Sequence, residues 1–290
     1  MSQGSTQVSS GRSVEVVDID FPEPNDPAAQ SERSVQALVT HSRMQSWRLL
    51  KRWSRDPTTV VQALLYPALM LLMFSIVLGE SIEKATGVPA VYGYVPMMIL
   101  TGSMFGSVVS AVGLRMEKES GLLGRFWTMP IHRASGLVGR MIAESVRVVA
   151  TTIVILIAGF ALGFRFDQGP LAALALLLIP LLFSVAFAMM VTALATYAGK
   201  APLVEIVSLM CTLLMFFNTG FVPLMAYPKW LQPIVEHQPM SYAIDVMRGL
   251  SLGGPVLTPM IGTLVWSVGM FAVFLFPAIR GYKHAAQTGA

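Results

Sequence analysis

Cysteine and charge are both scarce in this chain of 290 residues. Its one cysteine, Cys211, excludes a disulfide within the chain and a metal site built from several thiolates. Charged residues make up 12% of the chain and apolar residues 54%, so a water-soluble domain of this length would lack the charge to cover its surface. With a mean hydropathy of +0.64, the sequence predicts a membrane protein.

Sequence signals of catalysis are also missing. No phosphate-binding loop of the form Gly-x-x-x-x-Gly-Lys-Ser/Thr occurs, and no soluble stretch is long enough for a nucleotide-binding domain, so we do not expect this chain to hydrolyse ATP. The four histidines, His41, His132, His237 and His284, are spread along the chain without a carboxylate cluster. We therefore predict no catalytic residue, no metal site and no cofactor on this chain, and the net charge of +4 gives no indication of nucleic acid binding.

Long apolar runs are what the sequence has in place of these signals. A helix needs roughly 20 mostly apolar residues to cross a bilayer, and the runs lack the period-2 alternation of barrel strands. The predicted fold class is an all-α polytopic membrane protein. Its six spans are expected at about Thr58–Leu78, Tyr94–Leu114, Met141–Phe164, Leu171–Tyr197, Leu203–Leu224 and Leu257–Ile279.

Lysine and arginine indicate the orientation, because they are retained on the cytoplasmic side. With both termini inside, 15 of these residues lie in cytoplasmic segments and four lie outside. We expect a multi-pass plasma-membrane protein with both termini in the cytoplasm and no signal peptide. The expected organisation is a disordered tail over 1–34, an interfacial helix over 35–56, a transmembrane domain over 57–282 and a cytoplasmic tail over 283–290.

The expected interfacial helix is amphipathic. Met44, Trp47 and Leu50 recur at helical spacing, which suits a helix that lies among the acyl chains with cations near anionic headgroups. Either it is a plain anchor or it also braces a cytoplasmic partner. The residues assigned to this helix are Arg43, Trp47, Arg48, Lys51 and Arg52.

A polar segment separates the second and third spans. Ser120 and Gly121 allow a bend, two glutamates favour a helix start, and Pro130 ends the element. The pattern predicts a short transverse helix over Glu117–Trp127 that presents aromatic and charged side chains to the cytoplasm; the alternative is an ordinary basic loop. Its candidate functional residues are Glu117, Glu119, Gly121, Leu122, Leu123, Arg125, Phe126, Trp127, Pro130 and Arg133.

The segment after the fifth span holds two short amphipathic pieces, Lys229–Glu236 and Met240–Leu250, separated by Pro239. Each is too short to span, so the segment forms either re-entrant half-helices in the outer leaflet or a folded extracellular cap. The residues singled out there are Pro223, Pro228, Trp230, Pro239, Tyr242 and Arg248.

Polar and large side chains inside the spans leave several alternatives open. Glu144 and Arg147, three apart, form either a structural pair or part of a gate. Asn218 either hydrogen-bonds to a partner subunit or lines an exit. Three roles fit the large side chains Met210, Met215, Phe216 and Phe217: they line a substrate path, they contact a partner subunit, or they face lipid.

These motifs carry a resemblance. Glu119-x-Gly121, Leu122-Leu123, Pro130, Arg133 and Arg140 resemble the cytoplasmic motif of ABC-2 type permeases, and the proline-rich outer segment through Arg248 resembles the outer re-entrant motif of that family. The stretch from Leu122 to Leu137 and the stretch His237-Gln-Pro-Met-Ser-Tyr-Ala resemble more closely the daunorubicin-resistance (Drr) type of actinobacterial exporter, in particular its C-type permease, over nearly all of 40–285.

The resemblance implies half of a membrane pathway. The pathway would be completed by a second permease, different from this chain, so that the pair is heteromeric. Two copies of an ATPase subunit would carry ATP and Mg. It also implies a large hydrophobic or amphipathic cargo, either a phthiocerol dimycocerosate-type envelope lipid or an anthracycline-type drug. The alternatives are an ABC-2 exporter of another cargo, such as a glycolipid, and an ion-coupled secondary transporter, although spans one, two, four and six carry no acidic residue in their interiors.

Overall fold

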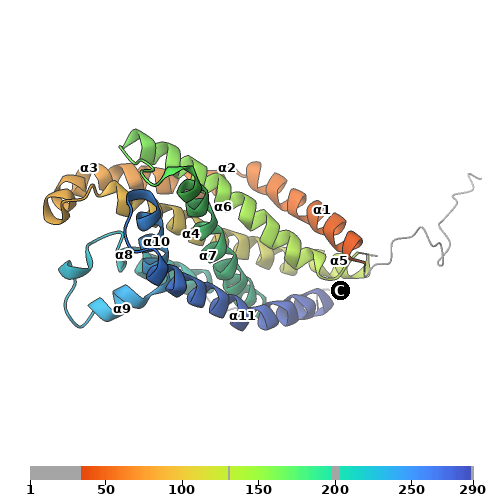
Figure 1. Cartoon of the computed structure of the whole chain (residues 1–290). Helices are drawn as coiled ribbons and strands as arrows, with labels where there is room; N and C mark the ends of the chain where they lie inside the picture. Colours follow the sequence, from red (N-terminus) through yellow and green to blue (C-terminus); the bar gives the residue numbers. More distant parts are fainter. Residues whose placement is uncertain (1–33, 130, 198–202, 289–290) are drawn as a thin grey trace, which may run out of the picture.

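The computed structural model describes residues 34–129, 131–197 and 203–288, and the regular structure in these ranges is helical. Long helices run side by side along one direction (Figure 1). The start of α1 (Val35–Ser54), the short helix α5 (Leu122–Thr128) and the end of α11 (Leu257–Thr288) lie at one end of this bundle, and α9 (Gln232–His237) lies near the other. We call these the α5 end and the α9 end.

Five helical stretches are long and apolar enough to cross a bilayer: Ala63–Thr86, Val91–Glu119, Ser135–Ala161, Gly169–Tyr197 and Leu257–Gln287. The all-α polytopic fold class is thereby confirmed. These stretches belong to α3 (Tyr66–Thr86), α4 (Val91–Glu119), α6 (Ser135–Ala161), α7 (Gly169–Tyr197) and α11.

The predicted span over 203–224 differs from the structure. Helix α8 (Leu203–Phe216) has 14 residues, fewer than the roughly 20 that a crossing requires, and the chain turns after Phe216. The predicted boundary at Leu224 is wrong, because Leu224 belongs to a separate short 3-10 helix, η2 (Leu224–Ala226). Six spans remain a prediction.

The first span begins irregularly. The α-turn α2 (Pro57–Val60) leads into a π-helical turn, η1 (Val61–Leu65), before α3 continues. Pro67 lies just beyond the π turn, and its ring would crowd the carbonyl four residues back in a regular α-helix. The π turn relieves this crowding without ending the span. Helix α3 then extends to Thr86, eight residues past the predicted end.

Helix α4 is the centre of the bundle. It contacts α3, α6, α7, α8 and α10 (Pro239–Leu252). Side chains along its first half, including Tyr94, Met98 and Leu100, are fully buried. At its other end α4 continues to Glu119, five residues past the predicted limit. A displacement of α4 would therefore be felt by most of the other helices.

Helix α1 packs closely on α6. Its buried residues are the small ones Ala37, Ser42 and Ser46, and a Cβ atom on Gly139 of α6 would lie 2.9 Å from the Ser42 carbonyl oxygen. The absence of a side chain at Gly139 is therefore what allows the two backbones to approach. The His132 amide also donates to His41 Nδ1 over 3.1 Å. The structure thus joins α1 to the start of α6.

The outward side of α1 carries large apolar residues. Met44 is 64% exposed and Trp47 is 68% exposed, whereas Leu50 is only half-buried. Ser34 caps the helix by accepting a hydrogen bond from the Ala37 amide over 3.1 Å. Residues 1–33 of the predicted tail lie outside the described residues. At the other terminus α11 runs to Thr288, nine residues past the predicted end of the sixth span at Ile279, and the cytoplasmic tail over 283–290 stays a prediction.

The α9 end contains the predicted outer pieces in altered form. The first piece, predicted over Lys229–Glu236, is helical only from Gln232 and continues to His237 as α9, and the second begins at Pro239, which is the first residue of α10. Helix α10 packs against α4, α7 and α11, and Met240, Ile244 and Met247 are fully buried. This helix is therefore part of the protein core.

Candidate functional site

The α5 end contains a sharp turn between α4 and α5. Gly121 adopts φ +69°, a left-handed conformation that side-chain-bearing residues rarely adopt. The turn divides the helix predicted over Glu117–Trp127, and that prediction is wrong in its boundaries. Glu117 and Glu119 lie in the last turn of α4, where the helix dipole disfavours negative charge. A nearby cation offsets this effect for each carboxylate: Arg140 for Glu117 and Arg115 for Glu119.

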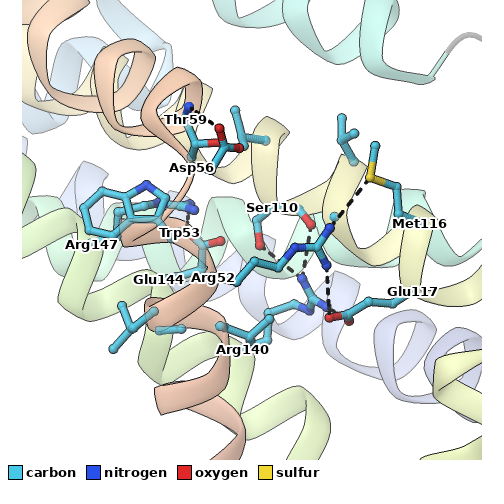
Figure 2. Close-up of a pocket in the computed structure, with 16 residues that line it drawn as sticks. Arg52, Trp53, Asp56, Thr59, Ser110, Met116, Glu117, Arg140, Glu144 and Arg147 are labelled. Atoms are coloured by element: carbon cyan, nitrogen blue, oxygen red, sulfur yellow. Dashed lines mark hydrogen bonds and ion pairs between the residues drawn. The ribbon is translucent and has the colours of Figure 1, made fainter.

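Glu117 is the centre of a buried charge cluster. Its side chain is 2% exposed and lies 2.7 Å from Arg140 Nη2 of α6, 3.0 Å from Arg48 Nη1 of α1 and 3.8 Å from Arg52 Nη1 of α1. Figure 2 shows Arg52 and Arg140 pointing toward this carboxylate. We call Glu117, Arg48, Arg52 and Arg140 the Glu117 cluster.

Arg140 is held from two sides. Its Nη1 donates to the Ser110 carbonyl oxygen over 3.1 Å and to Ser110 Oγ over 3.2 Å, while Nη2 faces Glu117. The Arg140 residue is 3% exposed. A buried ion that loses its counter-ion is strongly destabilising, so the Arg140–Glu117 contact ties α6 to the end of α4.

Arg48 links the cluster to α5. Its guanidinium carbon lies 4.9 Å from the centroid of the Phe126 ring, within the range of a cation–π interaction. The same side chain meets Glu117 at 3.0 Å. One arginine of α1 therefore contacts both the end of α4 and the helix that follows the turn.

Helix α5 faces inward with its apolar residues. Leu123 is 2% exposed, Leu122 and Phe126 are half-buried, and the helix contacts α11 and α4. Leu123 therefore packs into the protein, and the predicted presentation of aromatic and charged side chains to the cytoplasm stays a prediction. Arg125 is exposed, as is Arg133 before α6. The side chain of Trp127 and all of Pro130 lie outside the described residues.

A second charged pair lies deeper on α6. Glu144 and Arg147 form the predicted ion pair, and both residues are buried. Together with Glu117, Arg140 and Arg52 they line a cavity of about 210 Å³ between α1, α4 and α6 (Figure 2). Six of the residues that line this cavity are ionisable: Arg52, Asp56, Glu117, Arg140, Glu144 and Arg147. A role of the pair in gating stays a prediction.

The remaining interfacial residues are not equivalent. Arg43 and Lys51 are exposed, whereas Arg48 and Arg52 reach the Glu117 cluster. The i, i+4 spacing of Arg48 and Arg52 places them on one face of α1. Helix α1 therefore presents one cationic face to the protein and Trp47 to its surroundings.

The α9 end has a cluster of its own around the turn after α8. Asn218 is fully buried, its side-chain oxygen accepts from the Gly220 and Phe221 amides over 2.8 and 2.9 Å, and its Nδ2 donates to the Leu214 carbonyl over 3.0 Å. These bonds close the end of α8 within the same chain. They differ from both roles expected for Asn218, a contact with a partner subunit and a place on an exit path.

Arg248 and Asp245 complete this outer cluster. Arg248 Nη2 donates to the Thr219 carbonyl over 2.7 Å and Nη1 to Asp245 Oδ1 over 3.3 Å, and Thr219 Oγ1 donates to the same carboxylate over 2.9 Å. Burial raises the pKa of Asp245, against the opposing effects of Arg248 and the Thr219 hydrogen bond. The cluster fixes the turn against α10.

The other residues singled out at this end are more dispersed. Pro223 precedes η2, and the Pro228 carbonyl accepts from the Leu231 amide over 2.8 Å. Trp230 is 73% exposed, while Tyr242 is half-buried with its ring 6.1 Å from that of His237. Of these residues, only Arg248 takes part in the outer cluster.

The side chains of α8 considered for a substrate path divide by exposure. Met215 is buried, Met210 is partly buried against the core, and Phe216 and Phe217 are 41% and 40% exposed. The four residues therefore do not line one common surface.

The comparison with known proteins covers most of the chain. Residues 43–252 match the model of the ABC-2 type transporter. The chain belongs to this family. It is 43% identical over 256 residues to the "Probable doxorubicin resistance ABC transporter permease protein DrrC" of Mycobacterium tuberculosis, a match that covers 88% of this chain and 93% of the relative.

Two further relatives are more distant ABC transporter permeases. The "Daunorubicin resistance ABC transporter permease protein DrrB1" of Streptomyces coeruleorubidus is 27% identical, with 87% of each chain covered. DrrB of Mycobacterium tuberculosis is 25% identical, with 82% of this chain and 88% of the relative covered. The resemblance to Drr-type ABC-2 permeases is confirmed, and such permeases are transmembrane components rather than enzymes.

In this ABC-2 permease, sequence reasoning singled out Glu117 but missed its environment. Arg140 was assigned only to the motif, although it contributes the closest contact to the carboxylate. A signal was present, because Arg140, Glu144 and Arg147 recur at spacings of four and three and therefore share one face of a helix. Three charged residues on one face of an apolar helix indicate a buried polar site.

Proposed function

We propose that this chain is a permease subunit of an ATP-driven exporter, and that a separate ATPase acts on α5. The Glu117 cluster is the observation that carries this proposal. Arg48 contacts both Phe126 of α5 and the buried carboxylate that α4 and α6 share. A displacement of α5 would therefore disturb the contacts that hold α1, α4 and α6 together, and rigid helices would convey the change along the bundle.

Membership of the ABC-2 family supports a proposal for the assembly. We propose two copies of the ATPase, which carry ATP and Mg, and a second permease that makes the pair heteromeric. The α5 end would face the cytoplasm of a plasma membrane. The excess of lysine and arginine in the segments assigned to that side supports this orientation, and so does the position of the start of α1 and the end of α11 at the same end of the bundle (Figure 1).

We propose a large hydrophobic or amphipathic cargo. Anthracycline-type drugs are supported by relatives whose names refer to doxorubicin and daunorubicin resistance. A complex envelope lipid of the phthiocerol dimycocerosate type is supported by the Drr resemblance alone. Both are large molecules with apolar surface.

Charge reversal on α5 tests the coupling. In vesicles that contain this chain, its ATPase and the second permease, we expect Arg125→Glu to lower ATP hydrolysis and doxorubicin export by about tenfold, because an exposed cation facing a partner would be replaced by an anion. Arg43→Glu, an equally drastic change on exposed α1 surface, serves as the control and should change both rates less than about twofold.

The result would contradict the proposal if Arg125→Glu assembled and hydrolysed ATP like the unaltered complex. Export that persists without ATP but requires an ion gradient would instead favour a secondary transporter. Extraction of vesicle lipids after transport would separate the two cargo classes, since only a lipid exporter moves an added envelope lipid to the opposite leaflet.

A further inference from the structure

A long groove lies between α6, α7 and α11, separate from the cavity of the Glu117 cluster. Its volume is about 730 Å³, within the usual range for small-molecule sites. Along most of its length it is lined by apolar side chains such as Met141, Met189, Phe271 and Leu275. A surface of this kind in a membrane protein is filled by a lipid chain or by another apolar body.

One end of the groove is cationic. His132, Arg133 and Lys283 lie there, and Arg133 and Lys283 are exposed. Neither aspartate nor glutamate is among the described residues that line the groove. The two exposed cations, Arg133 and Lys283, attract an acidic headgroup more strongly than a neutral one.

The depth of the groove suits one leaflet. On α11 the lining residues run from Lys283 to Phe271, and at 1.5 Å per residue this distance is about 18 Å. Half of a hydrocarbon core of about 30 Å is about 15 Å. An acyl chain whose headgroup lay beside Lys283 would therefore end near the bilayer midplane.

We infer that this groove binds an acidic phospholipid. Its phosphate lies beside Arg133 and Lys283, and one acyl chain follows Met141, Met189 and Leu275. Basic pockets between transmembrane helices recognise anionic headgroups by charge, and each cation near the membrane surface contributes favourably. The inference does not depend on ATP-driven export, because it rests on the shape and charge of the groove alone.

The headgroup position adjoins α5. A small pocket of about 60 Å³ shares His132, Arg133 and Tyr282 with the groove and is also lined by Leu123 and Phe126 of α5. The same Phe126 lies under Arg48 of the Glu117 cluster. A bound lipid headgroup would therefore lie next to the helix that the cluster holds.

Native mass spectrometry of the detergent-solubilised chain tests the inference. Phosphatidylglycerol and phosphatidylcholine with identical acyl chains are supplied together, and the retained lipids are counted. We expect preferential retention of phosphatidylglycerol, and we expect Arg133→Ala with Lys283→Ala to weaken it by about thirtyfold, from about 1 kcal/mol for each cation. Arg165→Ala with Lys229→Ala removes the same two residue types from exposed positions that do not line the groove and should have little effect.

A steric pair of variants tests the apolar part. Ile279 lines the groove and is 50% exposed, and Ile261 on the same helix is 53% exposed but does not line it. Ile279→Trp should displace both lipids, and Ile261→Trp should displace neither. Equal retention of the two lipids by the unaltered chain would overturn the inference. So would unchanged retention of phosphatidylglycerol in Ile279→Trp, because the acyl chain would then lie outside the groove.

Discussion

Two carboxylates at opposite ends of the bundle are neutralised in different ways. Glu117 is 2% exposed and receives arginines from two other helices, α1 and α6. Asp245 is 33% exposed and receives its arginine from its own helix, three residues on, together with the hydroxyl of Thr219. The first arrangement forms only when three helices have assembled, whereas the second needs one helix and one turn.

This difference separates two kinds of stabilisation. A local pair that water reaches contributes little, because solvent screens it. A buried cluster that joins several helices makes each of them depend on the others, and the loss of one member leaves an uncompensated charge. We therefore expect the α5 end to respond as a unit to a change at one residue, and the α9 end to tolerate a similar change.

The largest effect is expected from Glu117→Gln. It leaves Arg140 buried without a counter-ion, and the loss of one partner of a buried pair costs about 3–5 kcal/mol. Thermal unfolding of the solubilised chain should show the loss directly. Glu119→Gln, two residues away, breaks only the exposed pair with Arg115 and should cost less than about 1 kcal/mol. Equal effects of the two changes would remove the distinction between a buried and an exposed carboxylate.

A smaller effect is expected from the contact between α1 and α5. In a double-mutant cycle of Arg48→Ala and Phe126→Leu, the coupling energy should be about 0.5–1 kcal/mol, as for a partly exposed cation–π pair. The measurement is the unfolding free energy of the two single variants and the double variant. A coupling energy of zero would mean that packing alone holds α5. The stabilising contact of Arg48 would then be its ion pair with Glu117 and not its contact with Phe126.

The smallest effect is expected from Asp245→Asn. Because burial raises the pKa of Asp245, the folded chain binds a proton there more tightly than the unfolded chain, and this stability contribution is lost as pH rises through the raised pKa. The amide should therefore raise stability slightly at neutral pH, by less than about 1 kcal/mol. The gain should disappear below the usual titration range of aspartate, and unfolding measured at several pH values checks this sign. Destabilisation at neutral pH would mean that the outer cluster, like the Glu117 cluster, depends on its charged carboxylate for stability.

Sequence reasoning located most helices because long apolar runs need no tertiary information. It failed where one residue decides a boundary. Helix α4 ends at Glu119, and Gly121 makes the turn that separates it from α5. The predicted helix over Glu117–Trp127 crosses this turn, because it treats the glycine as a bend within one helix rather than as a turn that separates two helices. Similarly, Asn218 binds the end of α8, so the apolar run through Leu224 contains a helix end that hydropathy does not reveal.

The Glu117 cluster could not be predicted in full for a different reason. Arg48 and Glu117 come from helices separated by the whole first span, and periodicity within one helix carries no information about which helices meet. The small residues Ser42, Ser46 and Gly139, which decide how α1 lies on α6, give only a weak signal in a membrane protein. The sequence indicates the charged face of α6, but it does not indicate that Glu117 of α4 lies against that face.

The contact between α1 and α6 also has a consequence for biosynthesis. His41 and His132, which meet there, are 91 residues apart. At a synthesis rate of about 5–20 residues per second, α1 leaves the ribosome about 5–20 s before its partner exists. In that interval its serine face has no helix to cover it, and Met44 and Trp47 are the side chains that can hold it at the membrane surface. If α1 lies at the membrane surface, as we predict, its exposed stripe acts first in insertion, before α6 is available to complete the packing.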